Sequence, residues 1–171
     1  MAGSIFKIVP HSCADSNNLY ERLNYIRNPL ATNVCMTFGS YVSCRYPWEE
    51  MMMVKQSHLS PCNNTLQGKH FFEIVVSLPQ DESERVQDFV RCVQEINRFM
   101  ATYNGGHYQT ISCVHINTNN LHAHIICNNI DLFTGARFNL SLRTFIELRT
   151  GVNVILQTFG FVGLCRKKKA T

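Results

Sequence analysis

A short polar string between two β-rich runs constrains this fold more than any other feature of the sequence. Residues 108–116 and 121–128 are rich in β-branched residues, and the string Asn117-Thr118-Asn119-Asn120 separates them. Two such runs joined by a few polar residues are typical of a β-hairpin. Closing the hairpin symmetrically places His115 opposite His122, and residues directly opposite on antiparallel strands share one face of the sheet.

The same hairpin predicts a metal site. His124 lies two positions beyond His122, so its side chain shares the face of His115 and His122. The residues between them alternate toward a core: Leu121, Ala123, Ile125 and Cys127. Three imidazoles that converge on one point suit a divalent ion, and three protein ligands leave positions open for a substrate, as catalytic metal sites do.

Two other interpretations of these histidines remain open at the level of sequence. They could be three unrelated surface or core residues. A cupin-type site also uses the spacing His-x-His, but it needs a glutamate a few residues later, where this chain has Ile125, Ile126 and Cys127.

The remaining elements indicate the fold class. The residue patterns predict strands at 4–9, about 40–45 and 70–78, and helices at 17–27, 49–59, 82–100 and 141–158. The helix at 82–100 has a continuous apolar stripe, and Asn28-Pro29 ends the helix at 17–27 because the residue before proline avoids the α region. We expect one α/β domain, a two-layer sandwich with a central, largely antiparallel β-sheet flanked by helices.

Composition sets limits on the environment and the partners. The eight cysteines are scattered without a Cys-x-x-Cys pair, which favours reduced thiols and a cytoplasmic protein. No apolar run approaches the roughly 20 residues that span a bilayer. The net charge of +4 permits nucleic-acid binding without establishing it. The basic residues that could contact a DNA backbone are Arg22, Arg27, Lys55, Lys69 and the run at 166–169.

Three stretches carry a resemblance to a known family. The stretch VHINTNNLHAHIICNNID, followed by TGARFN, resembles the third motif of plasmid mobilisation relaxases, the HUH-type single-strand endonucleases of conjugation. The stretch LNYIRNP, residues 23–29, is similar to the motif that carries their nucleophilic tyrosine. The stretch HFFEIVVSLPQDE, residues 70–82, is similar to their second motif. The resemblance covers roughly residues 4–160 and implies an HUH endonuclease-like fold.

The resemblance implies a set of roles. Tyr25 would be the nucleophile, His115, His122 and His124 the metal ligands, and Ser77 a contact to the DNA near the scissile phosphate. It implies nicking of one strand at a transfer origin, with a 5′-phosphotyrosine adduct and a free 3′-hydroxyl. Mg or Mn would serve activity, although imidazoles also bind Zn or Ni. The partners would be single-stranded origin DNA and accessory relaxosome proteins, with a nuclease domain at 1–160 and a basic tail at 161–171.

Several alternatives stay open. Tyr20 is a second candidate nucleophile, although five positions on a helix turn the chain by about 140°, so Tyr20 and Tyr25 cannot both face one site. Asn117 stands where family members often have aspartate, which weakens the expected support of the metal site and favours a domain that binds DNA without cutting it. A rolling-circle replication initiator would have its His-x-His motif before the tyrosine, whereas Tyr25 comes first here.

Overall fold

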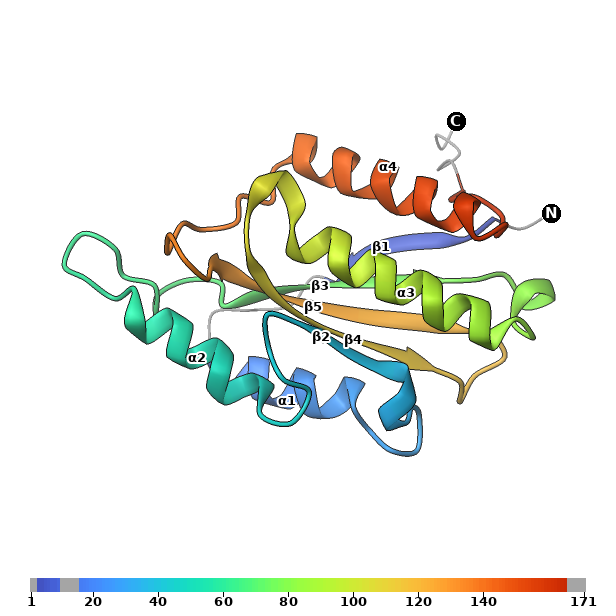
Figure 1. Ribbon diagram of the computed structural model, residues 1–171, viewed down its shortest axis with the longest axis horizontal. Coiled ribbons are helices and arrows are strands. Elements are labelled where there is room, and N and C mark those ends of the chain that lie inside the picture. Colours follow the sequence, from blue (N-terminus) through green and yellow to red (C-terminus); the bar gives the residue numbers. More distant parts are fainter. Residues whose placement is uncertain (1–2, 10–15, 166–171) are drawn as a thin grey trace.

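The computed structural model describes residues 3–9 and 16–165, and the predictions for the basic run at 166–169 lie outside these residues. In this part of the chain, five strands form one sheet in the order β1-β3-β5-β4-β2, and every neighbouring pair is antiparallel (Figure 1). The strands are β1 (Ile5–Val9), β2 (Thr37–Ser40), β3 (Phe71–Ser77), β4 (Tyr108–His115) and β5 (His122–Asp131). The predicted antiparallel sheet is confirmed.

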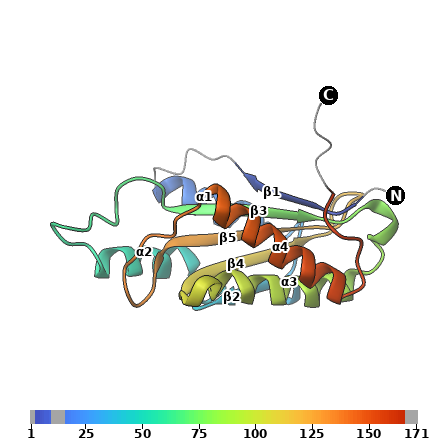
Figure 2. The ribbon, with the colours of Figure 1, turned by 90° about the horizontal axis from the view of Figure 1, so that it is seen from above.

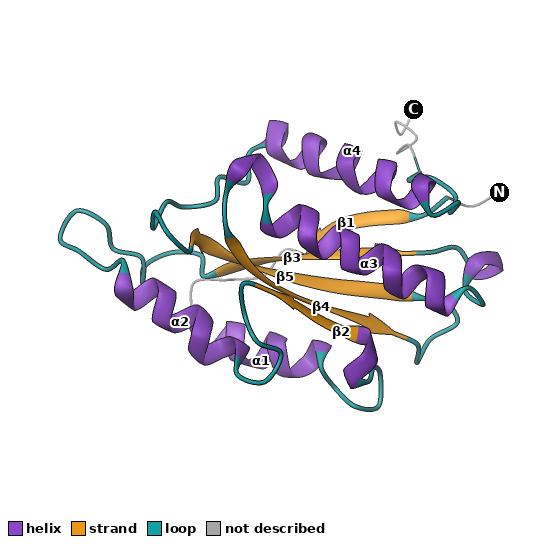
Figure 3. Cartoon of the chain, viewed as in Figure 1, coloured by secondary structure: helices purple, strands orange, loops and turns teal. Residues whose placement is uncertain are grey.

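Helices cover the sheet on both faces (Figure 3). They are α1 (Ser16–Ile26), α2 (Pro47–Ser57), α3 (Val86–Ala101) and α4 (Leu142–Thr158), with short 3-10 turns at Val34–Met36, Gln80–Glu82 and Tyr103–Gly105. The sheet with α3 and α4 forms the two layers that we expected, and α1 and α2 pack against the opposite face. The predicted α/β class is therefore confirmed, with α1 and α2 as an addition to the two-layer description.

The larger core lies between the sheet and helices α3 and α4. The predicted apolar stripe of α3 faces this core, and the side chains that alternate along β5, Leu121, Ala123, Ile125 and Cys127, are buried in it. Gly151 lies inside α4, where a glycine normally weakens a helix. A Cβ atom at this position would lie 2.3 Å from the ring of Phe99, so the glycine allows α3 and α4 to approach closely.

The smaller core fixes the position of α1. Leu19, Leu23 and Ile26 are buried against Met51 of α2 and against strand residues such as Ile111. These three α1 residues recur at helical spacing, which is why one face of the helix binds the sheet. The C-terminal end of α1 therefore lies beside the end of β4 that carries His115.

The chain segments at the two ends of the described region lie side by side. Ser4 and Leu164 form a parallel bridge, and the amide of Cys165 donates to the carbonyl of Ser4 over 2.9 Å. Figure 2 shows the start of β1 and the segment after α4 at the same end of the molecule. No helix among the described residues has both the length and the hydropathy to cross a bilayer.

One predicted strand is wrong. The strand expected at about 40–45 lies earlier, at Thr37–Ser40, and residues 41–45 form bends. Tyr41 has a φ of +57°, in the left-handed region that interrupts a strand. The backbone then folds back, so that a Cβ atom on Gly39 would lie 2.2 Å from the carbonyl oxygen of Val42. The turn therefore prevents an extended strand over this stretch.

Lys55 is a second correction, because it does not contact solvent or DNA. Its side chain is fully buried, and its ammonium donates to the carbonyl oxygen of His70 over 2.7 Å and to Oδ1 of Asn129 over 2.8 Å. It donates as well to Oδ1 of Asn128. Burial is the main cause that lowers the pKa of Lys55 to about 7. The residue ties α2 to the end of the central strands β3 and β5 that lies away from the histidines.

Replacing Lys55 with Met should lower the free energy of unfolding by about 1–3 kcal/mol, because buried oxygen acceptors lose their donor. The unfolded chain holds the Lys55 proton more tightly than the folded protein does, so wild-type stability should rise from about pH 7 toward pH 9. The variant should lack this component of the rise. Denaturant unfolding of both proteins at several pH values measures both effects, and equal stability throughout would contradict them.

Candidate metal and nuclease site

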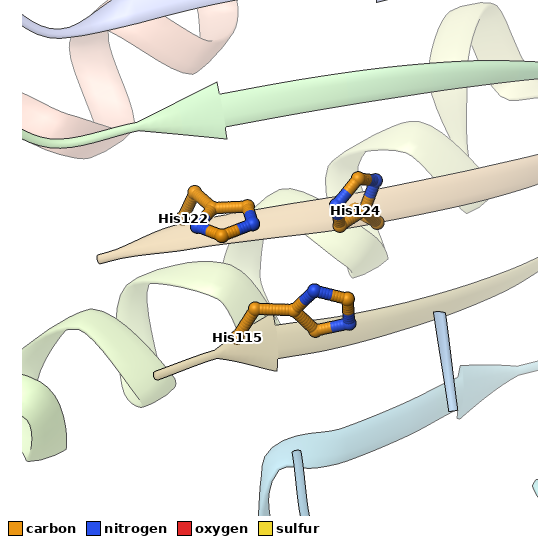
Figure 4. Close-up of side chains that lie close together, drawn as sticks. All are labelled: His115, His122 and His124. Carbon is orange, nitrogen blue, oxygen red and sulfur yellow. The ribbon is translucent and has the colours of Figure 1, made fainter. Parts of the chain in front are cut away.

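Three histidines converge at the end of the β4–β5 hairpin (Figure 4). His115 pairs with His122 and Cys113 pairs with His124, which confirms the predicted register. The three ring centroids are 4.6 to 5.3 Å apart. One nitrogen from each ring lies within 4.8 Å of the other two, close enough for one ion to bind all three.

The hydrogen bonds of the rings leave a lone pair on each imidazole. His115 Nε2 lies 2.7 Å from the carbonyl oxygen of Ile26, His122 Nδ1 lies 2.9 Å from that of Asn120, and His124 Nδ1 lies 2.7 Å from Oε1 of Glu73. These oxygens only accept, so the three nitrogens carry the protons and the opposite nitrogens are free to bind a metal. Within the described residues, the buried Nε2 of His124 has no hydrogen-bond partner. A buried nitrogen without a hydrogen-bond partner is suited to be a metal ligand.

The surroundings of His115 and His122 also favour their neutral rings. Burial lowers the pKa of His115, and the neighbouring His124 and His122 lower it further, against a hydrogen bond to Ile26 that raises it. Burial is likewise the main cause that lowers the pKa of His122. A neutral imidazole is the form that binds a metal ion, so the lowered pKa values of His115 and His122 favour metal binding by these two residues.

Sequence reasoning missed Glu73, which holds His124 in place. Glu73 is fully buried on β3 and lies in register with β5, so its carboxylate reaches the ring of His124. The signal was present in the sequence: Glu73 is the one acid inside an otherwise apolar run, four residues before Ser77 and therefore on the same face. Glu73 thus supplies a carboxylate beside the histidines. Asn117, which stands where family members often have aspartate, lies in the exposed turn of the hairpin.

Arg22 links this carboxylate to the candidate nucleophile. Its Nε and Nη2 donate to the two oxygens of Glu73 over 2.9 and 2.7 Å, a two-pronged contact that fixes the guanidinium plane. The same guanidinium lies over the ring of Tyr25, 4.2 Å from its centroid. Sequence reasoning considered Arg22 as a DNA contact, whereas the structure gives it a position between Glu73 and Tyr25.

Tyr25 lies beside the histidines and Tyr20 does not. The ring centroid of Tyr25 is 6.1 Å from that of His115 and 5.7 Å from that of His124, and the residue is 52% exposed. Tyr20 packs instead against Trp48, with ring centroids 5.9 Å apart. Tyr25 occupies the last turn of α1, so its ring projects over the end of the hairpin as expected from its place before Asn28-Pro29.

Ser77 lies on the same face at the end of β3. It pairs with His122 across the β3–β5 ladder, so its side chain points to the same side as the three imidazoles. It is partly exposed, and among the described residues its hydroxyl makes a single long contact of 3.4 Å, to the carbonyl oxygen of Leu78. A phosphate or sugar could therefore replace that contact.

The comparisons with known proteins agree with this arrangement. The family model for the MobA/VirD2-like relaxase nuclease domain matches residues 25–161. The fold is similar to a manganese-bound crystal structure of the MobM relaxase domain with plasmid pMV158 oriT DNA, at 12% identity and a TM-score of 0.66 over 99% of this chain and 94% of that one. A structure concerning the molecular basis of vancomycin resistance transfer in Staphylococcus aureus matches at 14% identity and a TM-score of 0.60, over 98% and 100%. No curated protein matches significantly.

The fold and the family match together define a nuclease domain of the relaxase class, with a three-histidine cluster that could hold a metal ion. The family model covers most of the chain, so the protein belongs to the MobA/VirD2-like relaxase nuclease domain family. The structural matches, at such low identity, add support for the fold.

Proposed function

We propose that this protein is a relaxase that nicks one DNA strand at the transfer origin of a plasmid or conjugative element. The observation that carries the proposal is the position of Tyr25, whose ring lies beside three histidines with converging lone pairs. A hydroxyl nucleophile next to a potential cation site is the arrangement that phosphoryl transfer to a tyrosine requires.

The proposed reaction is a transesterification. The Tyr25 oxygen attacks the scissile phosphorus and forms a new P–O bond, while the 3′-oxygen of the preceding nucleotide leaves and takes up a proton. The Tyr25 hydroxyl loses its proton to solvent, and the products are a 5′-phosphotyrosine and a free 3′-hydroxyl. The new phosphotyrosine ester conserves the energy of the broken phosphodiester for later rejoining. A bound divalent ion, held by His115, His122 and His124, would supply charge withdrawal from the phosphate oxygens.

Side chains around the histidines would position the reactants. Arg22, held by two hydrogen bonds to Glu73, lies over the Tyr25 ring and would keep that ring beside His124. Ser77, on the same face beside His122, would hold the DNA next to the scissile phosphate.

The proposed working metal is Mn or Mg. The MobM relaxase domain was crystallised with Mn and oriT DNA, and its fold is similar to that of this chain. Three imidazoles bind Zn or Ni more tightly than Mn or Mg, so the ion that the protein retains can differ from the ion that serves the reaction.

The function is tested with a labelled single-stranded origin oligonucleotide, Mn or Mg, and a denaturing gel. A protein–DNA adduct that survives detergent and boiling supports the proposal. Tight metal-dependent binding of the oligonucleotide with no adduct in either metal would contradict nicking and identify a domain that only binds DNA.

The form of the substrate gives a further prediction. We expect cutting of single-stranded DNA and of supercoiled origin plasmid, but not of relaxed blunt duplex, because Tyr25 must reach an unstacked and exposed backbone. Binding should weaken as salt rises, since contacts between basic side chains and phosphates release counterions. Gel assays at several salt concentrations measure both effects, and equal cutting of relaxed duplex and single strand would indicate another class of nuclease.

A further inference from the structure

A pocket of about 310 Å³ opens immediately beyond the end of α1. One wall is the segment that follows α1, and the other comes from Thr37 at the start of β2 and Cys44 in the turn after it. Ile26 accepts a hydrogen bond from His115, and the amide of Ile116 donates to the carbonyl oxygen of Ala31 over 3.0 Å. The first wall is therefore fixed to the strand end that carries the histidines, so the pocket lies close to that strand end.

The lining of the pocket combines flat apolar surface with one cation. Pro29 and Val34 contribute apolar surface to the pocket. Val34 is 89% exposed, and the neighbouring Leu30 is also largely exposed. The guanidinium of Arg27 lies in the wall, where its Nη1 donates to the carbonyl oxygen of Cys44 over 2.9 Å. Surfaces that bind single-stranded nucleic acid combine a cation near the backbone with faces on which bases stack.

Thr32 provides an independent indication of a ligand. The residue lines the pocket and is only 6% exposed. Its hydroxyl is buried without a hydrogen-bond partner among the described residues. Buried hydroxyls are nearly always paired, and an exception needs an explanation in the function of the protein or in a missing partner. The amide of Asn33, next in the wall, adds a second group that can pair with a polar edge.

We propose that this pocket binds one unstacked nucleobase next to the scissile phosphate. The faces of the base would pack against Pro29 and Val34, its polar edge would pair with Thr32 and Asn33, and Arg27 would contact the adjoining phosphate. Because the Thr32 hydroxyl is buried, the proposal requires the pocket lining to move when the base enters. The inference rests on the proposed function, because it takes the scissile phosphate to lie at the histidines. According to this inference, the pocket determines which base the protein prefers at one position of the origin.

The experiment uses a pool of random 30-nucleotide single strands with Mn, presented to the wild type, to Thr32→Val and to Thr158→Val. Sequencing the bound strands, and the strands recovered as adducts, gives the base preference at each position relative to the cut. Thr32→Val keeps the shape and removes the hydroxyl, so it should lower the preference at one position beside the cut by at least about fivefold. Other positions should be unchanged. Thr158→Val makes the same change at an exposed position of α4, and its base preferences should match those of the wild type.

Thermal unfolding of Thr32→Val checks that the variant folds, and we expect a melting temperature equal to or above that of the wild type, because an unpaired buried hydroxyl is removed. Adducts with identical base preferences in the wild type and Thr32→Val would overturn the pocket assignment and leave the nuclease proposal intact. Selected binding without any adduct would contradict the nuclease. In that case, a preference lost at one position in Thr32→Val would still support the pocket.

Discussion

Changing Tyr25 to Phe should abolish the covalent protein–DNA adduct, with cleavage falling by on the order of 10³-fold or more, as expected when a nucleophile is removed. The substitution removes only the hydroxyl oxygen, so the ring still packs under Arg22 and beside His124. The fold and the affinity for the origin strand should therefore survive. The measurement is the adduct on a denaturing gel, with binding followed separately by fluorescence anisotropy.

Tyr20→Phe is the matched control for this result. Tyr20 lies on the same helix with nearly the same exposure as Tyr25, but its ring packs against Trp48 and not against the histidines. The control should form the adduct at the wild-type rate. An adduct that persists in Tyr25→Phe and disappears in Tyr20→Phe would show that the nucleophile is wrongly assigned.

The second large effect concerns the metal. Replacing His122 and His124 together with Ala should reduce Mn affinity by more than about 100-fold, since even partners outside the ligand shell contribute 10- to 100-fold. Cleavage should be lost with the metal, because without the ion no group withdraws charge from the phosphate oxygens. Calorimetric titration with Mn measures the affinity, and the adduct assay measures the activity.

His107→Ala serves as the control for the metal experiment. His107 precedes β4 at the end of the strand away from His115, and its ring lies near Asp131. This variant should bind Mn as the wild type does. Unchanged Mn affinity in the double variant of His122 and His124 would exclude the triad as the metal site.

The sequence predicts those parts of the site that depend on local geometry. Strand alternation and a symmetric hairpin are sufficient to place His115, His122 and His124 on one face, and the helix break at Asn28-Pro29 is sufficient to place Tyr25 at a helix end. These features depend on residues close together in the chain. Backbone periodicity therefore determines them before any long-range contact forms.

The parts that could not be predicted depend on contacts between distant segments. Glu73 meets His124 only because β3 pairs with β5 in one register, and Arg22 meets Glu73 only because α1 packs under β3. Lys55 showed the opposite error: a charge on a helix suggested a contact to the DNA backbone, whereas the carbonyl oxygen of His70 and the side-chain oxygens of two asparagines bind its buried ammonium. Local sequence carries no information on which distant segment supplies such partners.

The hydrogen bond between His115 and the last carbonyl of α1 has a thermodynamic consequence. The proton that His115 donates to Ile26 fixes the tautomer that leaves its other nitrogen open to a metal. Helix docking and ion binding are therefore linked, and each must strengthen the other by the same factor. Mn should slow amide hydrogen exchange in α1, and a destabilised α1 should weaken Mn binding equally. Such coupling would make the nucleophile rigid when the ion is in place and allow it to loosen when the ion leaves.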